Sequence, residues 1–160
     1  SKVLIEFKMS RSRDGPLNFL KDWSGTLITD GYSGYNEVIA RNGIVRGGCW
    51  AHARRKFTQA LDTGARSAAR VLVPIQRLFA IERALTNRAN ARGMKREDFV
   101  ELRARVRQQR SKRLVALMLE RTGGLSRLRS TVPESKLGKA VTYDLRQQRP
   151  LSTFLDDARI

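Results

Sequence analysis

The first fifty residues alternate between short apolar runs and polar turns, the pattern of strands separated by helices. Residues 2–8 alternate apolar and polar side chains and predict a half-buried strand. Residues 26–29 and 44–49 are short apolar runs beside glycine and predict buried strands. Short helices are expected between the strands, at residues 15–23 and 35–41. This order favours an α/β layer arrangement.

The rest of the chain repeats its apolar residues with a helical period. Helices are predicted at residues 51–62, 66–119, 135–148 and 151–157. Residues 66–119 are expected to turn back at Gly93 and form a hairpin of two antiparallel helices, in which Pro74 either starts or kinks the first helix. The second helix loses its apolar stripe at residues 109–110 and is expected to stop at residues 122–124. The fold class is therefore α/β and mostly helical.

The charge balance points to a polyanionic partner. Lys and Arg outnumber Asp and Glu by 32 to 15, which gives a formal net charge of +17. Such an excess opposes compaction unless a polyanion relieves it, and arginine grips phosphate oxygens in pairs. We therefore expect a nucleic-acid partner. Charge alone does not separate a DNA enzyme from a ribosomal or other basic binding protein.

Length and composition indicate what class of protein this is. A chain of 160 residues with 41% apolar content can bury a core as one domain. No stretch approaches the roughly 20 apolar residues of a membrane span, and no signal-peptide pattern opens the chain. We expect a cytoplasmic, nucleoid-associated protein with no membrane partner. The single cysteine excludes an intrachain disulfide, and Cys49 with His52 supplies too few ligands for a structural zinc site.

Asp30 is the first candidate for chemistry. It follows the predicted strand at residues 26–29, and open α/β sheets bind ligands outside the carboxyl ends of their strands. Gly31 and Gly34 let the backbone turn sharply and would leave room for a ligand beside the carboxylate. The alternative is that Asp30 only accepts backbone N–H groups within its own turn. The local pattern leaves both interpretations open.

Several segments carry a resemblance to a known family. The most specific blocks are Asp-Gly-Tyr-Ser-Gly-Tyr at residues 30–35 and Gly-Cys-Trp-Ala-His-Ala-Arg-Arg-Lys-Phe at residues 48–57. Ile-Glu at 81–82, Leu-Gly-Lys-Ala at 137–140 and the closing residues 154–160 match as well. In these segments, and along nearly its whole length, the chain resembles the transposases of the insertion-sequence sixty-six family.

The resemblance implies a ribonuclease-H-like core that carries an Asp, Asp, Glu metal triad, with Asp30 matching the second Asp. The family's first Asp lies upstream of Ser1 and its Glu lies beyond Ile160, so neither is in this chain. The implied fold is a partial core of about three strands at residues 1–49, a basic helical insertion at residues 50–148 and a return toward the core at residues 149–160.

The chemistry that the resemblance implies is two-metal phosphoryl transfer on DNA. Two Mg²⁺ or Mn²⁺ ions, held by the triad with DNA present, would assist strand cleavage and joining. Because one Asp cannot hold both ions, we expect this chain alone neither to cut nor to join DNA. The implied partners are transposon ends and target DNA, a homo-oligomer and companion transposition proteins.

Two basic groups are candidate DNA contacts. Arg54, Arg55 and Lys56 are expected in the first turn of a helix, where cations are unfavourable unless a phosphate or a neighbouring carboxylate compensates. His52 either contacts a DNA phosphate, positions metal-bound water near Asp30, or merely fixes the joint between strand and helix.

The second basic group lies in the hairpin. Arg96, Arg103 and Arg107 are expected along one edge of its second helix, either solvated or touching DNA. Glu82 falls within an apolar stripe and needs an arginine partner; its alternative role is the third member of the triad, although the family's Glu comes later. The adjacent pair at residues 156–157 is not assigned a metal.

Two functional hypotheses remain. The chain is either the central part of a DDE-type transposase or a non-catalytic basic DNA-binding module, for instance a decayed remnant. Both predict DNA binding with a steep salt dependence.

Overall fold

The computed structural model describes residues 14–41 and 43–160, and every structural statement below concerns those residues. The strand expected at residues 2–8 lies outside them. The elements in chain order are α1 (Asp14–Phe19), β1 (Thr26–Thr29), η1 (Ser33–Tyr35), α2 (Asn36–Arg41), β2 (Val45–Gly48), α3 (Trp50–Asp62), η2 (Arg66–Ala68), α4 (Ala69–Ala91), α5 (Arg96–Val106), η3 (Arg107–Ser111), α6 (Lys112–Ser126), α7 (Lys136–Arg146), α8 (Gln148–Ser152) and η4 (Thr153–Leu155).

The two strands confirm the predictions at residues 26–29 and 44–49. β1 and β2 pair in parallel, with Thr26 opposite Val45 and Thr29 opposite Gly48. Parallel neighbours need a crossover connection, which η1 and α2 supply here. Both strands therefore end at the same edge of the sheet. The third strand and the ribonuclease-H-like core stay predictions.

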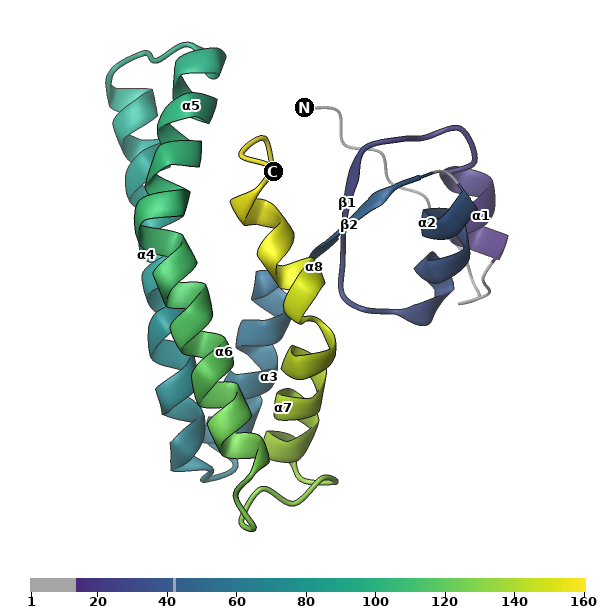
Figure 1. Ribbon diagram of the computed structural model, residues 1–160, viewed down its shortest axis with the longest axis vertical. Coiled ribbons are helices and arrows are strands. Elements are labelled where there is room, and N and C mark those ends of the chain that lie inside the picture. The colour runs from purple at the N-terminus through teal and green to yellow at the C-terminus, as the bar shows by residue number, and fades with distance from the viewer. Residues whose placement is uncertain (1–13, 42) are drawn as a thin grey trace.

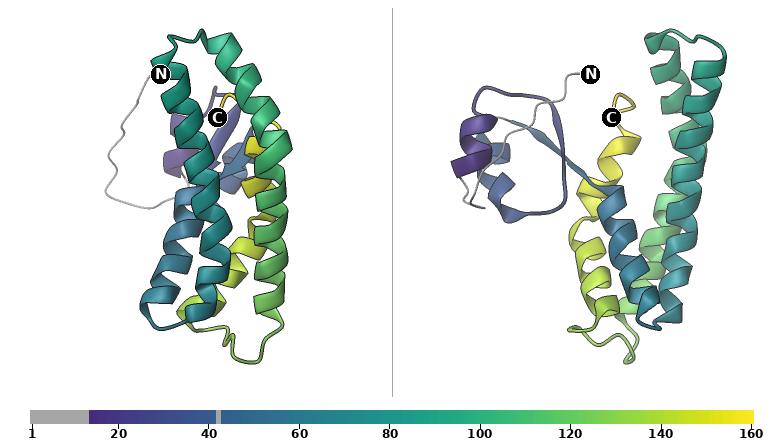
Figure 2. Two further views of the ribbon diagram at one scale, coloured as in Figure 1. Left: turned by 90° about the vertical axis from the view of Figure 1, so that its left-hand side faces the viewer. Right: turned by 180° about the vertical axis from the view of Figure 1, so that it is seen from behind.

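Four helices form the main core. α3 packs against α4 and α7, and α6 packs against the same two helices, so the four enclose a shared interior. The sheet, α1 and α2 lie to one side of this bundle, as Figures 1 and 2 show. The fully buried side chains of Phe57, Ile75 and Met118 lie at the centre of the bundle. Burying each of these side chains contributes roughly 1.5–3 kcal/mol to the stability of the bundle.

The predicted helical hairpin is confirmed. α4 and α5 meet at a turn in which the Met94 amide donates to the Ala89 carbonyl at 3.0 Å, with Gly93 inside the turn. The chain then continues through η3, a π-helical segment, into α6 (Figure 1). This segment covers residues 109–110, so the interrupted apolar stripe marks a real change of helical period.

Pro74 lies inside α4 rather than at its start. A proline has no N–H, so the carbonyl of Arg70 loses its usual partner four residues along. The guanidinium of Arg121 donates to that carbonyl at 2.6 Å. A side chain of α6 therefore replaces the missing backbone bond of α4.

The expected helix stop at residues 122–124 is wrong, because α6 continues to Ser126. Each glycine in a helix costs about 1 kcal/mol relative to alanine. The last turn holds Leu125, which is 2% exposed and packed in the core. Burying that side chain, worth roughly 1.5–3 kcal/mol, offsets the glycines.

The last helical turns begin earlier than predicted and lie against the sheet. α8 starts at Gln148, so Pro150 falls in its first turn, where no intrahelical donor is lost. A Cβ on Gly48 would lie 2.8 Å from the amide nitrogen of Leu151, so only glycine lets β2 approach α8 this closely. The indole of Trp50 donates to the Leu151 carbonyl at 3.0 Å and secures the contact.

Candidate active site at the end of the parallel strands

Asp30 lies directly after β1 and is exposed. Its Oδ1 accepts the amide of Tyr32 at 3.0 Å, so the Asx-type turn considered from the sequence is present. The amide of Cys49, directly after β2, donates to the Thr29 carbonyl at 3.0 Å. The parallel pairing therefore brings the Asp30 turn and the beginning of α3 to one edge of the sheet.

The space beside Gly31 is occupied by α7. Gly31 has a φ of 90°, and a Cβ there would lie 3.1 Å from Gln147 Nε2 and 3.2 Å from Tyr143 Cε2. We expected the glycines to leave room for a ligand near the carboxylate. At Gly31 that room is taken by the side chains of Tyr143 in α7 and of Gln147, the residue directly after α7.

Side chains from α3 and α7 surround this turn. The rings of His52 and Tyr143 have centroids 6.0 Å apart, and Lys56 Nζ lies 4.9 Å from the Tyr143 centroid. Burial raises the pKa of Tyr143 to about 12, and Cys49 and Asp30 act in the same direction. The Tyr143 hydroxyl is buried without a hydrogen-bond partner in the described part of the chain. Tyr143 is therefore a neutral phenol at working pH.

His52 is engaged within α3. Nη2 of Arg55 lies 2.8 Å from His52 Nε2 and 3.1 Å from Nδ1, and because a guanidinium only donates, the imidazole accepts through one of these two nitrogens. Burial and Arg55 lower the pKa of His52, while Asp30 opposes them. A neutral imidazole is thus favoured, which agrees with the interpretation of His52 as a satisfied residue at the joint between strand and helix.

The cations of α3 lie one turn later than expected. α3 begins at Trp50, so Arg54, Arg55 and Lys56 fall in its second turn, where the helix dipole has faded. The expectation that they crowd the helix start is therefore wrong. Arg54 stacks over the ring of Phe79 with its guanidinium carbon 5.5 Å from the centroid. These cations have aromatic and imidazole neighbours and do not require a phosphate for stability.

Arg46 was missed by the sequence analysis. From β2 it donates to Thr29 Oγ1 at 3.2 Å, Asn36 Oδ1 at 3.3 Å and Gln147 Oε1 at 3.4 Å. It thus joins β1, α2 and the residue directly after α7 around the Asp30 edge. The signal that could have identified Arg46 is its position as a single arginine within an otherwise apolar strand.

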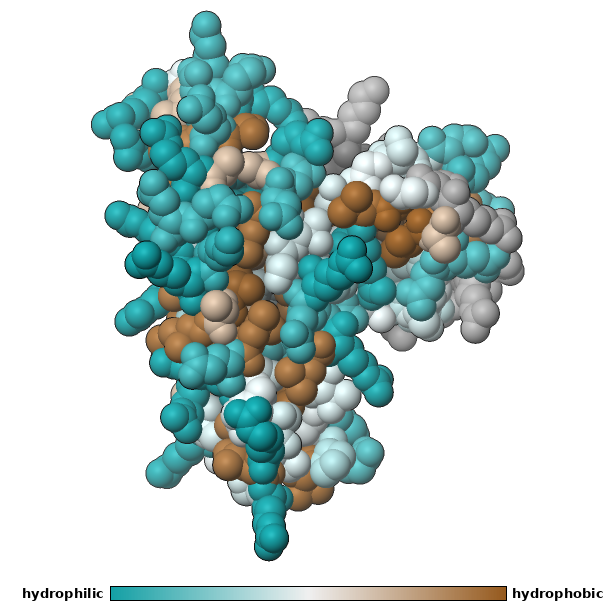
Figure 3. Space-filling view, viewed as in Figure 1, coloured by the Kyte–Doolittle hydropathy of each residue, from teal (hydrophilic) through white to brown (hydrophobic). Residues whose placement is uncertain are grey.

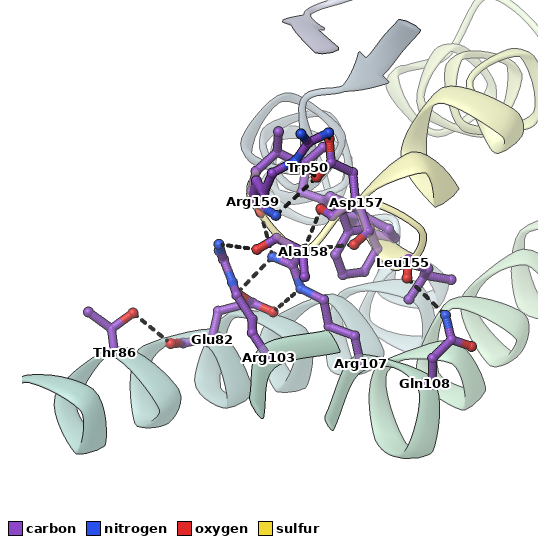
Figure 4. Close-up of polar contacts among 12 residues, drawn as sticks. Trp50, Glu82, Thr86, Arg103, Arg107, Gln108, Leu155, Asp157, Ala158 and Arg159 are labelled. Carbon is purple, nitrogen blue, oxygen red and sulfur yellow. Dashed lines mark hydrogen bonds and ion pairs between the residues drawn. The ribbon is translucent and has the colours of Figure 1, made fainter. Parts of the chain in front are cut away.

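The hairpin arginines behave differently from the expected exposed edge. Figure 4 shows Arg103 and Arg107 directed at Glu82 and at the closing segment of the chain. Arg107 is 2% exposed and donates to Glu82 Oε1 at 2.8 Å, and Arg103 donates to Glu82 Oε2 at 2.7 Å. Their other donors reach the carbonyls of Phe154, Asp157, Ala158 and Ile160. The interpretation of Arg107 as part of an exposed edge is therefore wrong, because its guanidinium is buried and donates its hydrogen bonds to groups within the protein.

Glu82 has the arginine partners that its position required. Burial raises the pKa of Glu82, but hydrogen bonds from Arg107 and Arg103 outweigh burial and leave the pKa lowered. Both carboxylate oxygens accept from arginine, so neither is free for a metal ion. By contrast, Arg96 is exposed at the start of α5, beside Glu97 and Asp98. Figure 3 shows that the end of the hairpin where α4 and α5 meet is largely hydrophilic.

The described residues contain no complete metal site. Among residues 14–41 and 43–160, no three His, Cys, Asp or Glu side chains are grouped so that they could hold a metal ion. The Asp157 carboxylate is taken by Arg159 and Thr26. Asp30 is exposed, so its carboxylate fits as one ligand of a Mg²⁺ ion that takes its other ligands from phosphates and further carboxylates.

The chain belongs to a family of transposases: the family model described as "Transposase IS66 family" matches residues 1–160. Over 166 residues it is 31% identical to the uncharacterized protein y4qI of Sinorhizobium fredii, which covers 99% of this chain and 29% of that protein. Over 161 residues the chain is 32% identical to the uncharacterized protein y4jD of the same organism, and this alignment covers 96% of the chain and 29% of that protein. The chain thus spans about three tenths of the length of these curated relatives. No solved structure matches it.

No helix in the described part of the chain is both long and apolar enough to cross a membrane.

Proposed function

We propose that this chain is the central part of a DDE-type transposase, which binds DNA and, in the complete protein, cleaves and joins DNA strands by phosphoryl transfer. The observation that supports this most is the position of Asp30, an exposed carboxylate at the shared end of two parallel strands, with Lys56 and Arg46 nearby. Membership of a transposase family supports this reaction class.

Each residue of the site has a proposed role. Asp30 is a ligand of Mg²⁺ or Mn²⁺, which when bound would stabilise charge on the phosphate under attack. Arg54, Arg55 and Lys56 hold DNA phosphates, and His52 fixes the α3 joint beside them. Arg96 stays a proposed DNA contact, whereas the inward hydrogen bonds of Arg103 and Arg107 argue for a structural role.

The proposed organisation follows the same division as before. Residues 1–49 would belong to a ribonuclease-H-like core, residues 50–148 to a helical insertion, and residues 149–160 to the return toward the core. The contacts of α8 with β2 and Trp50 support the last assignment.

Asp30→Asn in the complete protein is expected to lower metal-dependent strand cleavage and joining by about a thousandfold or more. Losing a metal ligand removes several kcal/mol of charge stabilisation, and each 1.36 kcal/mol is about tenfold in rate. Asparagine can still accept the Tyr32 amide, so the turn and DNA affinity should persist. The measurement is strand transfer on labelled DNA with Mg²⁺ or Mn²⁺. Activity at the wild-type level would favour the non-catalytic binding module.

The isolated chain is expected to show no nicking with either metal, since its one exposed site carboxylate cannot hold two ions. Metal-dependent nicking that disappears in Asp30→Asn would contradict this expectation.

DNA binding by the chain is expected to weaken roughly 10³–10⁵-fold between 50 and 200 mM salt, as for a protein with about 6–10 phosphate contacts. The reason is that a surface with net charge +17 binds DNA largely by releasing counterions. Fluorescence anisotropy with labelled duplex DNA measures the affinity. An affinity that is flat across this range would refute the DNA interpretation of the charge.

A further inference from the structure

A basic pocket adjoins the Asp30 turn on the side of α7. It encloses about 600 Å³ and is bounded by Gly31, Lys56, Glu134, Lys139, Tyr143 and Arg146. Gly31 is the residue directly after Asp30, so the pocket begins where the proposed reaction site ends. The sequence pattern indicated no role for this face of α7.

The amphipathic pattern of α7 explains why these side chains share one face. Leu137, Ala140 and Val141 are buried in the bundle core. Lys139, Tyr143 and Arg146 recur at spacings of four and three residues, which places them on another side of the same helix. Lys56 reaches this side from α3, with its ammonium 4.9 Å from the Tyr143 centroid. Three cations from two helices therefore converge on one pocket.

One acidic residue opposes them. Glu134 Oε2 lies 3.2 Å from Lys139 Nζ, and both side chains are largely exposed, at 87% and 60%. An exposed pair of this kind adds little stability. Lys139 can therefore exchange Glu134 for an external anion at little cost, and Glu134 weakens the attraction of the pocket for anions.

The length of the pocket indicates a strand rather than a single phosphate. Lys139 and Arg146 are seven positions apart on α7, which is about 10.5 Å along the helix axis. Successive phosphates of one DNA strand advance about 3.4 Å along the duplex axis, so this span covers roughly three nucleotide steps.

We propose that the α7 pocket binds the sugar-phosphate backbone of a DNA strand immediately next to the phosphate that lies at Asp30, with Lys139 and Arg146 as phosphate contacts and Lys56 between them. The proposal rests on the proposed function, because it places the DNA relative to Asp30. It adds α7 to the DNA path and assigns Glu134 as the residue that limits affinity there.

The test measures the affinity of the chain for duplex DNA by fluorescence anisotropy over a series of salt concentrations. Lys139→Gln/Arg146→Gln should bind at least about tenfold more weakly near 0.1 M salt, with a salt slope smaller by about 0.9 per lost contact. Arg77→Gln/Arg83→Gln removes the same charge from exposed positions of α4 and should change affinity less than about threefold. Glu134→Gln should bind more tightly than wild type.

The outcomes separate the two proposals. Equal losses in both double variants, or no gain in Glu134→Gln, would overturn the α7 pocket while leaving DNA binding intact. Wild-type chain that binds no DNA would overturn the proposed function together with the pocket. Thermal unfolding of each variant is the control for folding, and we expect these exposed substitutions to leave the unfolding temperature unchanged.

Discussion

Arg107→Met is expected to destabilise the chain by about 3 kcal/mol, the largest loss of folding stability among the substitutions considered. The Arg107 side chain is 2% exposed and makes five hydrogen bonds, to both oxygens of Glu82 and to the carbonyls of Phe154, Asp157 and Ile160. Removing one partner of a buried ion pair typically costs 3–5 kcal/mol. The lower end applies because Glu82 keeps 24% exposure and a second arginine. Urea unfolding of the chain measures the loss.

Two matched variants test the physical reason. Arg103→Met should cost only about 1 kcal/mol, since Arg103 is 20% exposed and Glu82 retains Arg107. Adding Glu82→Gln to Arg107→Met should recover about 1 kcal/mol or more, because it removes the charge left poorly paired. A loss below 1 kcal/mol in Arg107→Met would show that the buried network contributes little to stability.

Asp144→Asn is expected to stabilise the chain at pH 8 by up to about 3 kcal/mol and to have little effect near pH 3. Asp144 is fully buried in α7, and neither carboxylate oxygen has a hydrogen-bond partner among the described residues. The nearby Thr122 hydroxyl donates instead to the Met118 carbonyl at 3.0 Å. Burial raises the pKa of Asp144 from 3.8 to about 6.

The direction of the pH dependence follows from that pKa. Between pH 4 and 6 the folded state holds a proton that the unfolded state has released, so stability falls as pH rises. The decrease in the free energy of unfolding is complete above pH 6. At 1.36 kcal/mol for each unit by which the pKa is raised, this decrease reaches about 3 kcal/mol. The difference in unfolding free energy between wild type and Asp144→Asn, measured from pH 3 to 8, isolates this group. A difference that does not change with pH would show that Asp144 finds a partner when ionised.

The elements with strong local patterns were predictable, and the arrangement around Asp30 was not. Alternation and glycine boundaries located β1 and β2, and their parallel pairing put Asp30 at a sheet edge. The periodicity of α7 showed which side faces the core, but not that Tyr143 and Gln147 meet Gly31. That contact joins segments more than a hundred residues apart, and no local signal carries it.

For Arg107, the sequence pattern predicted the wrong surroundings of the side chain. Its spacing from Arg96 and Arg103 suggested a shared exposed edge, and the basic composition made DNA the obvious partner. The π-helical segment that begins at Arg107 changes the helical period there, so simple counting no longer predicts direction. The need of Glu82 for an arginine was predictable, whereas the carbonyls that Arg107 also reaches were not.

The bonds between the sheet and the closing segment affect the order of events during synthesis. Thr26 at the start of β1 donates to Asp157 across 131 positions, and Thr153 donates to the Arg46 carbonyl of β2 across 107. At about 5–20 residues per second, a ribosome needs roughly 7–26 s to make the 131 residues between Thr26 and Asp157. β1, which Asp30 directly follows, therefore leaves the ribosome long before the closing segment that contacts it has been made.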